Sequence, residues 1–238
     1  MSGIQSKRRT FPQIKICGLT QPDEAIRCAD AGADAIGLVF FPKSPRNVTI
    51  DQARSVVRAL PRTAATVGVF VNEDFEFIMK RVDRCGLSTV QLHGQESSAL
   101  AARLKAEGVG VIKALFVDGR PGLDNAADYH VDGYLVECAK GPLPGGNAMA
   151  WDWGAAAYVG RRYPLILAGG LCEDNVTDAI AACRPAAVDV SSGVEASPGR
   201  KDARRVSKFI EAVQSSASDY DNQVIPLVFI SERHHRHA

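Results

Sequence analysis

Hydrophobic residues in this chain gather in eight short runs that are rich in β-forming residues. The runs cover residues 14–17, 35–40, 65–71, 89–93, 109–116, 133–136, 165–168 and 187–190. Between them, apolar residues recur at the spacing of an amphipathic helix, as at Ala53, Val56 and Leu60. Thr49 and Gln52 form a capping-box pattern that predicts where this helix begins. The chain therefore alternates predicted strands with predicted helices.

Strands that alternate with helices pair in parallel, because each helix carries the chain back through a right-handed crossover. Eight such units in 238 residues predict a single-domain α/β protein, a (β/α)8 TIM barrel. We expect the barrel to span residues 13–214, between a basic flexible lead at residues 1–12 and a flexible extension at residues 215–238. The alternative is an open doubly wound sheet, although no G-x-G-x-x-G pattern follows the first strand.

Several predicted strands carry polar residues, although strands covered by helices should be apolar on both faces. At period two, three pairs of these residues share a strand face: Lys15 with Cys17, Gln91 with His93, and Asp189 with Ser191. Lys113 and Glu137 add one charge each from the fifth and sixth strands. Since active sites of such barrels lie at the carboxyl ends of the strands, these residues predict a site there.

Glycine-rich loops on the same side of the predicted barrel indicate a phosphate site. Gly169 and Gly170 end the seventh strand, and Ser192 and Gly193 follow the eighth. Glycine lets backbone N–H groups approach an anion, and barrels of this class often hold phosphate after strands seven and eight. The loop after the second strand carries Arg46, whose planar guanidinium suits a carboxylate or a phosphate. We therefore predict an anionic small-molecule ligand.

Composition argues against several other classes of protein. The formal net charge of +1 argues against nucleic acid as the main partner, and no apolar stretch approaches the roughly 20 residues that span a bilayer. The six cysteines show no close pairing such as C-x-x-C, which is typical of reduced thiols. The first residues lack the apolar core of a signal peptide. We therefore expect a cytoplasmic protein without membrane or nucleic-acid partners.

Six motifs along the chain resemble one enzyme family. They are KICG at residues 15–18, FPKSPR at 41–46, GVFVN at 68–72, VQLHG at 90–94, AGGL at 168–171 and VDVSSGVE at 188–195. Together they resemble phosphoribosylanthranilate isomerase over roughly residues 13–213. The resemblance implies an enzyme of tryptophan biosynthesis that isomerises N-(5′-phosphoribosyl)anthranilate to 1-(2-carboxyphenylamino)-1-deoxy-D-ribulose 5-phosphate. It implies an Amadori rearrangement that needs neither a metal nor an organic cofactor.

The resemblance also implies roles for particular residues. Cys17 is the implied general base, and we expect the nearby charge of Lys15 to raise its thiolate fraction. Arg46 is the implied partner of the anthranilate carboxylate, with Asp189 as a supporting carboxylate. The implied substrate-lining and phosphate-binding residues are Gln91, His93, Gly169, Gly170, Ser192 and Gly193.

The chain departs from the family pattern after the sixth strand. Glu137 stands where the family has the aspartate that serves as general acid. Because glutamate carries the same carboxyl group on a longer stem, we predict that Glu137 takes the acid role. The next loop reads Gly145-Gly146-Asn147-Ala148, whereas the family usually has a glycine at the fourth position. No phosphate contact is therefore assigned to Asn147 or Ala148.

Two other functions stay open on the sequence alone. A related phosphosugar isomerase of the histidine pathway, or a bifunctional relative, would use two aspartates, so Cys17 argues against it. A barrel that binds a phosphosugar without converting it is the second alternative. The sequence leaves open whether the protein is a monomer or a homodimer, and whether the apolar residues 224–230 pack on the barrel or on a partner. We assign no metal to the histidines at 234, 235 and 237.

Overall fold

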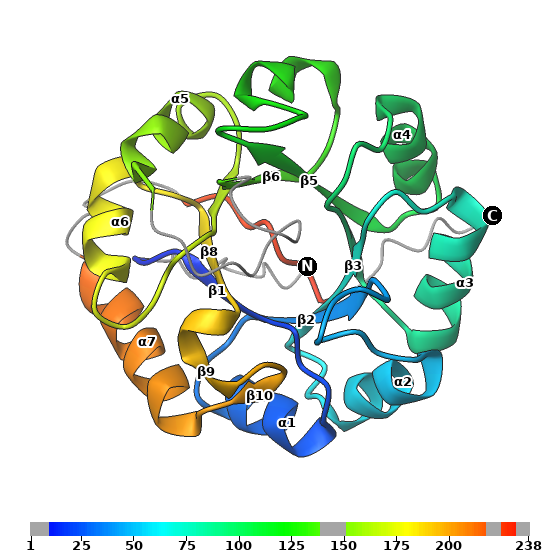
Figure 1. Cartoon of the computed structure of the whole chain (residues 1–238), viewed down its shortest axis with the longest axis horizontal. Helices are drawn as coiled ribbons and strands as arrows, with labels where there is room; N and C mark the ends of the chain where they lie inside the picture. The colour runs from blue at the N-terminus through cyan, green and yellow to red at the C-terminus, as the bar shows by residue number, and fades with distance from the viewer. Residues whose placement is uncertain (1–9, 139–150, 218–224, 232–238) are drawn as a thin grey trace, which may run out of the picture.

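Eight parallel strands form the centre of the molecule and close into a barrel (Figure 1). The computed structural model describes residues 10–138, 151–217 and 225–231. The strands are β1 (Gln13–Cys17), β2 (Ala35–Phe40), β3 (Ala65–Phe70), β4 (Thr89–Leu92), β5 (Gly110–Phe116), β6 (Gly133–Glu137), β7 (Leu165–Leu167) and β8 (Ala187–Val190). They pair in the order of the sequence, and β8 pairs with β1. This closed order confirms the predicted (β/α)8 barrel and excludes the open sheet.

Helices surround the barrel and cover the outer face of its strands (Figure 1). The α-helices are α1 (Pro22–Asp30), α2 (Ile50–Ala59), α3 (Phe75–Cys85), α4 (Ser98–Ala106), α5 (Ala157–Gly160), α6 (Val176–Cys183) and α7 (Ala203–Ser215). Short 3-10 helices lie at η1 (Leu123–Asp128), η2 (Trp153–Ala156) and η3 (Ser192–Val194), and β9 (Glu195–Ser197) pairs with β10 (Arg200–Lys201). Within the described residues, no helix has the length and apolar character that a membrane crossing requires.

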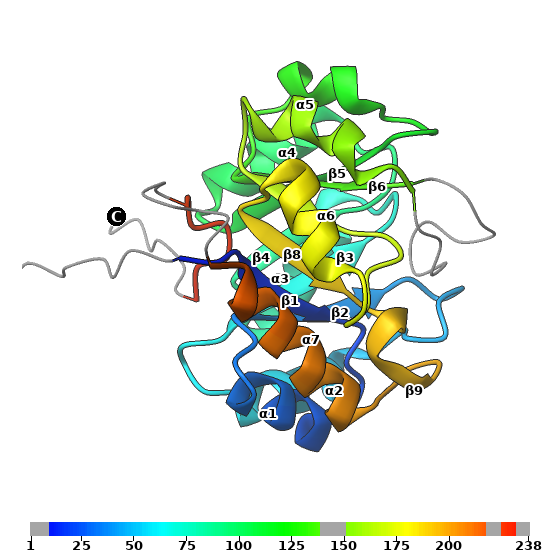
Figure 2. The ribbon, with the colours of Figure 1, turned by 90° about the vertical axis from the view of Figure 1, so that its left-hand side faces the viewer.

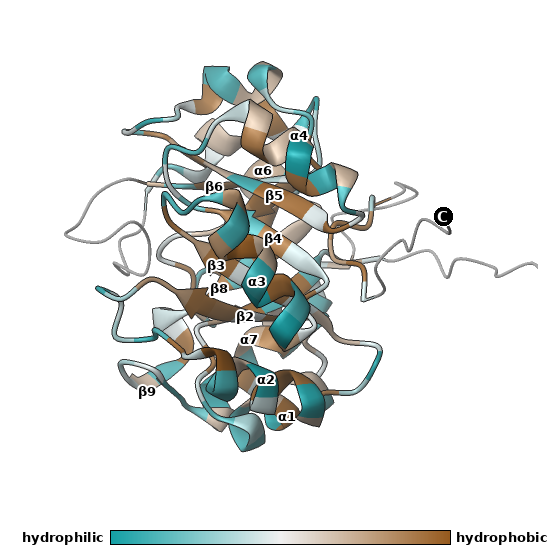
Figure 3. Cartoon of the chain, turned by 90° about the vertical axis from the view of Figure 1, so that its right-hand side faces the viewer, coloured by the Kyte–Doolittle hydropathy of each residue, from teal (hydrophilic) through white to brown (hydrophobic). Residues whose placement is uncertain are grey.

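The predicted amphipathic pattern accounts for how the helices pack. Ala53 and Val56 of α2 are fully buried, and the predicted capping box is present, with Thr49 and Gln52 each accepting from the other's backbone N–H. Figure 3 shows apolar strands enclosed by helices whose outward faces are hydrophilic. Burial of these helix faces therefore holds the strands, and the loops that follow them, in fixed positions.

Strand register places the polar strand residues opposite particular neighbours. The pairing of β1 with β8 sets Lys15 beside Asp189, and the pairing of β5 with β6 sets Phe116 beside Glu137. Gln91 of β4 lies beside Val69 of β3. Because register in a closed barrel is set around the whole ring, these contacts depend on all eight strands.

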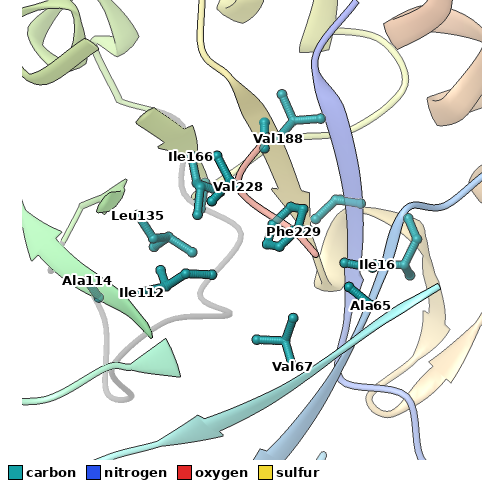
Figure 4. Close-up of a cluster of buried hydrophobic side chains, with 14 of the residues drawn as sticks. Ile16, Ala65, Val67, Ile112, Ala114, Leu135, Ile166, Val188, Val228 and Phe229 are labelled. Carbon is teal, nitrogen blue, oxygen red and sulfur yellow. The ribbon is translucent and has the colours of Figure 1, made fainter. Parts of the chain in front are cut away.

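Residues 225–230 close the opposite, amino end of the barrel. The amide oxygen of the Gln13 side chain accepts from the backbone N–H groups of Val228 (2.7 Å) and Phe229 (2.9 Å). The amide nitrogen of Gln13 donates to the Phe229 carbonyl at 3.0 Å. Val228 and Phe229 lie among apolar side chains from several strands, as Figure 4 shows. The segment lies at the end where β1 begins, away from β9 (Figure 2).

Described residues on both sides of the predicted barrel boundaries pack on the barrel. Helix α7 continues to Ser215, and residues 225–230 pack on this barrel, which decides between the two partners that the sequence left open. Pro12 is buried and Phe11 packs against the core, so packing begins before the predicted start of the barrel. Hydrogen bonds and apolar burial at these positions offset the loss of chain entropy.

Candidate active site

One pocket at the carboxyl end of the barrel brings all of the predicted site residues together. It is lined by Cys17, Arg46, Gln91, His93, Glu137, Gly169, Gly170, Asp189, Ser192 and Gly193. Phe41 and Ser44, from the loop after β2, complete one side of it. The pocket thus collects a thiol, two carboxyl groups, an imidazole and a guanidinium from strands that are far apart in the sequence.

An ion pair between β1 and β8 lies beside this pocket. The Lys15 ammonium is fully buried and donates to Oδ2 of Asp189 at 2.8 Å. Burial alone would lower the pKa of Lys15, but the Asp189 carboxylate raises it above its ordinary value. The other carboxylate oxygen, Oδ1, is buried and has no hydrogen-bond partner among the described residues. Asp189 therefore keeps Lys15 charged and has one unused acceptor.

Cys17 lies at the end of β1, with 8% of its surface exposed. Burial raises the pKa of the Cys17 thiol above its ordinary value, while the charges of Lys15 and Lys201 act in the opposite direction. Asp189 raises the pKa of Cys17 further. The Lys15 charge thus has the expected sign, but burial outweighs it, so the net effect on the pKa of Cys17 favours the protonated thiol.

A hydrogen-bonded chain runs from Gln91 through His93 to Glu137. The Gln91 side-chain nitrogen lies 3.0 Å from Nδ1 of His93, and Nε2 of His93 lies 2.9 Å from Oε1 of Glu137. Since the amide nitrogen is only a donor, Nδ1 accepts, and the proton of a neutral imidazole is then on Nε2. His93 therefore donates to Glu137. Among described residues, nothing is hydrogen-bonded to the second Glu137 oxygen.

The space around Glu137 is shaped by a glycine. Gly169 adopts a φ of +84°, and a Cβ at this position would lie 3.2 Å from Cβ of Glu137 and 2.9 Å from the Trp151 indole nitrogen. That indole nitrogen donates to the carbonyl of Ala168 at 3.1 Å. A side chain at residue 169 would therefore compete with Glu137 and Trp151 for the same space.

The loops after β7 and β8 have the backbone geometry of an anion site. Gly170 also has a positive φ, of +70°, and neither its N–H nor that of Gly169 is hydrogen-bonded to a described residue. Gly193 lies against the carbonyl of Leu171 so closely that a Cβ would overlap the carbonyl oxygen. Unpaired backbone N–H groups beside the pocket suit an anion such as a phosphate.

Arg46 is bound by Glu195, and Glu195 is bound in turn by Lys201. The sequence assigned no role to either of these two residues. The Nε and Nη2 of Arg46 donate to the two carboxylate oxygens of Glu195 at 2.8 and 2.6 Å. The Lys201 ammonium donates to the same carboxylate at 2.8 Å. Glu195 was visible in the last motif and Lys201 lies only six residues later, but no periodicity connects either one to a loop 149 residues away.

Lys113 does not belong to the site. Its buried ammonium donates to the carbonyl of Gly94 at 2.7 Å and to the Glu96 carboxylate at 2.8 Å, and it does not line the pocket. Glu96 also accepts from the backbone N–H groups of Asn72 and Gly94. The prediction that Lys113 belongs to the site at the strand ends is therefore wrong, because its ammonium binds Glu96 and a loop carbonyl outside the pocket.

Two features considered in the sequence lie outside the described residues. They are the Gly145-Gly146-Asn147-Ala148 loop and the histidines near the end of the chain. Within residues 10–138, 151–217 and 225–231, no group of His, Cys, Asp and Glu side chains has the arrangement of a metal site.

Comparison with known proteins identifies the family. The model of the N-(5′-phosphoribosyl)anthranilate (PRA) isomerase family matches residues 14–212. The chain belongs to this family. The PRA isomerase of Desulfatibacillum aliphaticivorans is 53% identical over 208 residues, which cover 87% of this chain and 95% of that protein. The PRA isomerase of Pelobacter propionicus is 42% identical, covering 87% of this chain and 98% of the relative.

Solved PRA isomerases share the fold of this chain. The phosphoribosyl anthranilate isomerase of Thermotoga maritima is 38% identical with a TM-score of 0.78, covering 86% of this chain and 99% of that chain. A phosphoribosyl anthranilate isomerase in complex with reduced 1-(o-carboxyphenylamino)-1-deoxyribulose 5-phosphate is also 38% identical, with a TM-score of 0.75 and the same coverage. These matches confirm the resemblance seen in the six motifs.

Proposed function

We propose that this chain isomerises N-(5′-phosphoribosyl)anthranilate to 1-(2-carboxyphenylamino)-1-deoxy-D-ribulose 5-phosphate. The observation that carries the proposal is that Cys17 and Glu137, from β1 and β6, line one pocket together with the glycine loops after β7 and β8. A base, an acid and an anion site in one cavity are what an isomerisation of a phosphosugar needs. Membership of the PRA isomerase family supports the same reaction.

Glu137 serves as the general acid in this proposal. The carboxyl proton passes to the furanose ring oxygen, the bond from that oxygen to C1′ breaks, and the nitrogen lone pair forms the C1′=N bond. The His93 N–H holds Oε1 of Glu137, so the proton transfer uses Oε2. The glycine at position 169 leaves space beside the Cβ of Glu137.

Cys17 serves as the base in the next step. The thiolate removes the proton from C2′, the electron pair forms a C1′=C2′ bond, and the C1′=N bond becomes a single bond to nitrogen. The resulting enolamine then loses the proton of its C2′ hydroxyl group and gains a proton at C1′, which gives the aminoketone product. C1′ is reduced as C2′ is oxidised, so the redox change is balanced within the substrate. This step needs Cys17 in its thiolate form, which the charges of Lys15 and Lys201 favour.

The other lining residues bind and orient the substrate in this proposal. Arg46 takes the anthranilate carboxylate, and the phosphate lies on the loops of Gly169, Gly170, Ser192 and Gly193. Oδ1 of Asp189 and Oε1 of Gln91 are buried acceptors without partners among the described residues, and both residues line the pocket. Ribose hydroxyl groups can donate to such acceptors, which supports a sugar as the ligand.

Complementation of a tryptophan auxotroph that lacks this isomerase tests the proposal. The wild-type chain is expected to restore growth, while Cys17→Ala and Glu137→Gln are expected not to. Growth with the Cys17→Ala variant would remove the assigned base. Failure of the wild-type chain, with soluble protein present, would favour a barrel that only binds a phosphosugar. Complementation of a histidine auxotroph instead would favour the histidine-pathway alternative.

A further inference from the structure

The Arg46 guanidinium has two edges, and only one of them is occupied. Glu195 takes the edge formed by Nε and Nη2. A guanidinium carries five N–H groups, so one on Nη2 and both on Nη1 are left for another acceptor. Nη1 has no hydrogen bond to a described residue. Arg46 can therefore hold a second carboxylate end-on while Glu195 stays in place.

Arg46, Glu195 and Lys201 differ in their relation to the pocket. Arg46 lines the pocket, whereas neither Glu195 nor Lys201 is among the lining residues. The stem of Arg46 crosses Gly18, where a Cβ would overlap its Cδ, so the side chain is confined between the β1 loop and Glu195. Glu195 and Lys201 thus stand behind the guanidinium as seen from the ligand.

The charges of these three groups do not cancel. Their side chains are almost completely buried, at 8% exposed for Arg46, 5% for Glu195 and 2% for Lys201. Arg46 and Glu195 alone would form a neutral pair, and a neutral pair attracts a ligand carboxylate weakly. Glu195 neutralises one positive charge, and Lys201 adds a second positive charge to that of Arg46. One net positive charge is then left for one carboxylate.

We propose that Lys201 is a specificity-determining positioning residue that supplies, through Glu195, the net positive charge with which Arg46 selects a substrate carrying an aromatic carboxylate. The inference rests on the proposed function, because it takes the carboxylate at Arg46 to be that of the anthranilate moiety. Lys201 acts without touching the ligand. Its further contacts, to the Ser191 carbonyl at 3.0 Å and to Glu195, hold the charge at a fixed place behind the guanidinium.

Binding measurements with two ligands test the proposal on the intact chain. The first ligand is reduced 1-(o-carboxyphenylamino)-1-deoxyribulose 5-phosphate, and the second is the same compound with a phenyl group in place of the carboxyphenyl group. The ratio of their dissociation constants, from titration calorimetry, measures the preference for the carboxylate. A general loss of structure would weaken both ligands and leave this ratio unchanged.

Lys201→Met is expected to lower the carboxylate preference on the order of tenfold, as the removal of one nearby charge in a partly screened site does. The double variant Lys201→Met/Glu195→Gln restores one net positive charge on Arg46 and is expected to recover the preference to within about threefold. Arg204→Met, which removes an exposed cation three residues later, is the matched control and is expected to change nothing. Lys201→Gln keeps a donor for Glu195 and replaces the Met variant if that one does not fold.

Equal weakening of both ligands in Lys201→Met, or no recovery in the double variant, would overturn the proposal, since Lys201 would then act only by supporting the loop. Failure of the proposed function looks different. In that case the wild-type chain itself would neither bind the reduced product analogue nor isomerise the substrate. A wild-type chain that prefers the carboxylate, with Lys201 variants that keep the full preference, would contradict the charge argument alone.

Discussion

The two ends of the barrel are built from the same eight strands but have opposite chemistry. At the carboxyl end the strands finish in Cys17, Glu137 and other polar residues around an open pocket. At the amino end, Val228 and Phe229 pack among apolar side chains such as Ile166 and Val188 (Figure 4). Packing is therefore concentrated at one end, and the other end is free to hold groups that stability alone would not select.

Buried carboxylates inside and outside the pocket differ in how completely they are paired. Lys113 and Glu96 form a buried pair that ties loop backbone together outside the pocket. Glu137 is equally buried, yet its partner is the His93 imidazole and one of its oxygens stays without a partner among the described residues. A carboxylate with unused capacity beside a cavity is available for chemistry, whereas one that is fully paired is structural.

Among the variants that test this difference, Glu137→Gln is expected to have the largest effect, and the effect is on kcat. The amide keeps the shape of the side chain but cannot give a proton, so kcat should fall about 10²- to 10⁴-fold, the contribution typical of a general acid. Binding of the reduced product analogue and the melting temperature should change little. Steady-state kinetics, calorimetry and thermal unfolding measure the three quantities.

Glu96→Gln is the matched control for that variant. It makes the same chemical change in a buried carboxylate outside the pocket, and it leaves the Lys113 ammonium without its counter-charge. We expect a lower free energy of unfolding, by about 3 kcal/mol or more, with near-normal kcat in the folded fraction. If Glu96→Gln lost turnover while its stability was unchanged, the distinction between a structural carboxylate at Glu96 and a catalytic one at Glu137 would be wrong.

The next largest effect is expected at the amino end of the barrel, on the free energy of unfolding. Phe229 is 4% exposed and packs on the bottom of the barrel, so Phe229→Ala should lower the free energy of unfolding by about 3 kcal/mol. Leu227, two residues earlier, is 54% exposed, and Leu227→Ala should change stability by less than about 0.5 kcal/mol. Denaturant unfolding measures both. If the two variants had equal stability, the segment would not close the barrel in solution.

A smaller effect is expected where the loops after β7 and β8, the proposed phosphate loops, meet. A Cβ at residue 193 would overlap the Leu171 carbonyl oxygen, so Gly193→Ala must push the loop after β8 away from the loop after β7. We expect KM for the phosphorylated substrate to rise by about tenfold, equivalent to ~1.4 kcal/mol, with a smaller change in kcat. An unchanged KM would place the phosphate elsewhere.

The smallest effect concerns the protonation of Cys17. Burial raises the pKa of this thiol and Lys15 opposes the rise, so Lys15→Met should raise the pKa of Cys17 further and leave less thiolate at a given pH. The rate of alkylation of Cys17 by iodoacetamide, followed over pH by peptide mass spectrometry, reports the thiolate. Lys15→Met/Asp189→Asn, which removes both charges of the pair, controls for the unpaired carboxylate. If the pH midpoint of the alkylation rate were the same in Lys15→Met as in the wild type, Lys15 would have no influence on the pKa of the Cys17 thiol.

Much of the fold follows from the sequence because its determinants are local. The alternation of β-rich runs and helical periods, with caps such as Thr49 and Gln52, locates strands and helices nearly to the residue. The position of Cys17 and Glu137 at strand ends follows from the same pattern, since a (β/α)8 barrel gathers all such ends on one side. The sequence by itself therefore determined many of the polar residues that line the pocket.

Only the tertiary structure decided which of those residues touch. His93 pairs with Glu137, and Arg46 with Glu195, across sequence separations that no periodicity reports. The same holds for the segment at residues 225–230, whose apolar character was evident but whose partner was not. The physical reason is that local pattern fixes the face on which a side chain lies, whereas its partner depends on the closure and register of the whole barrel.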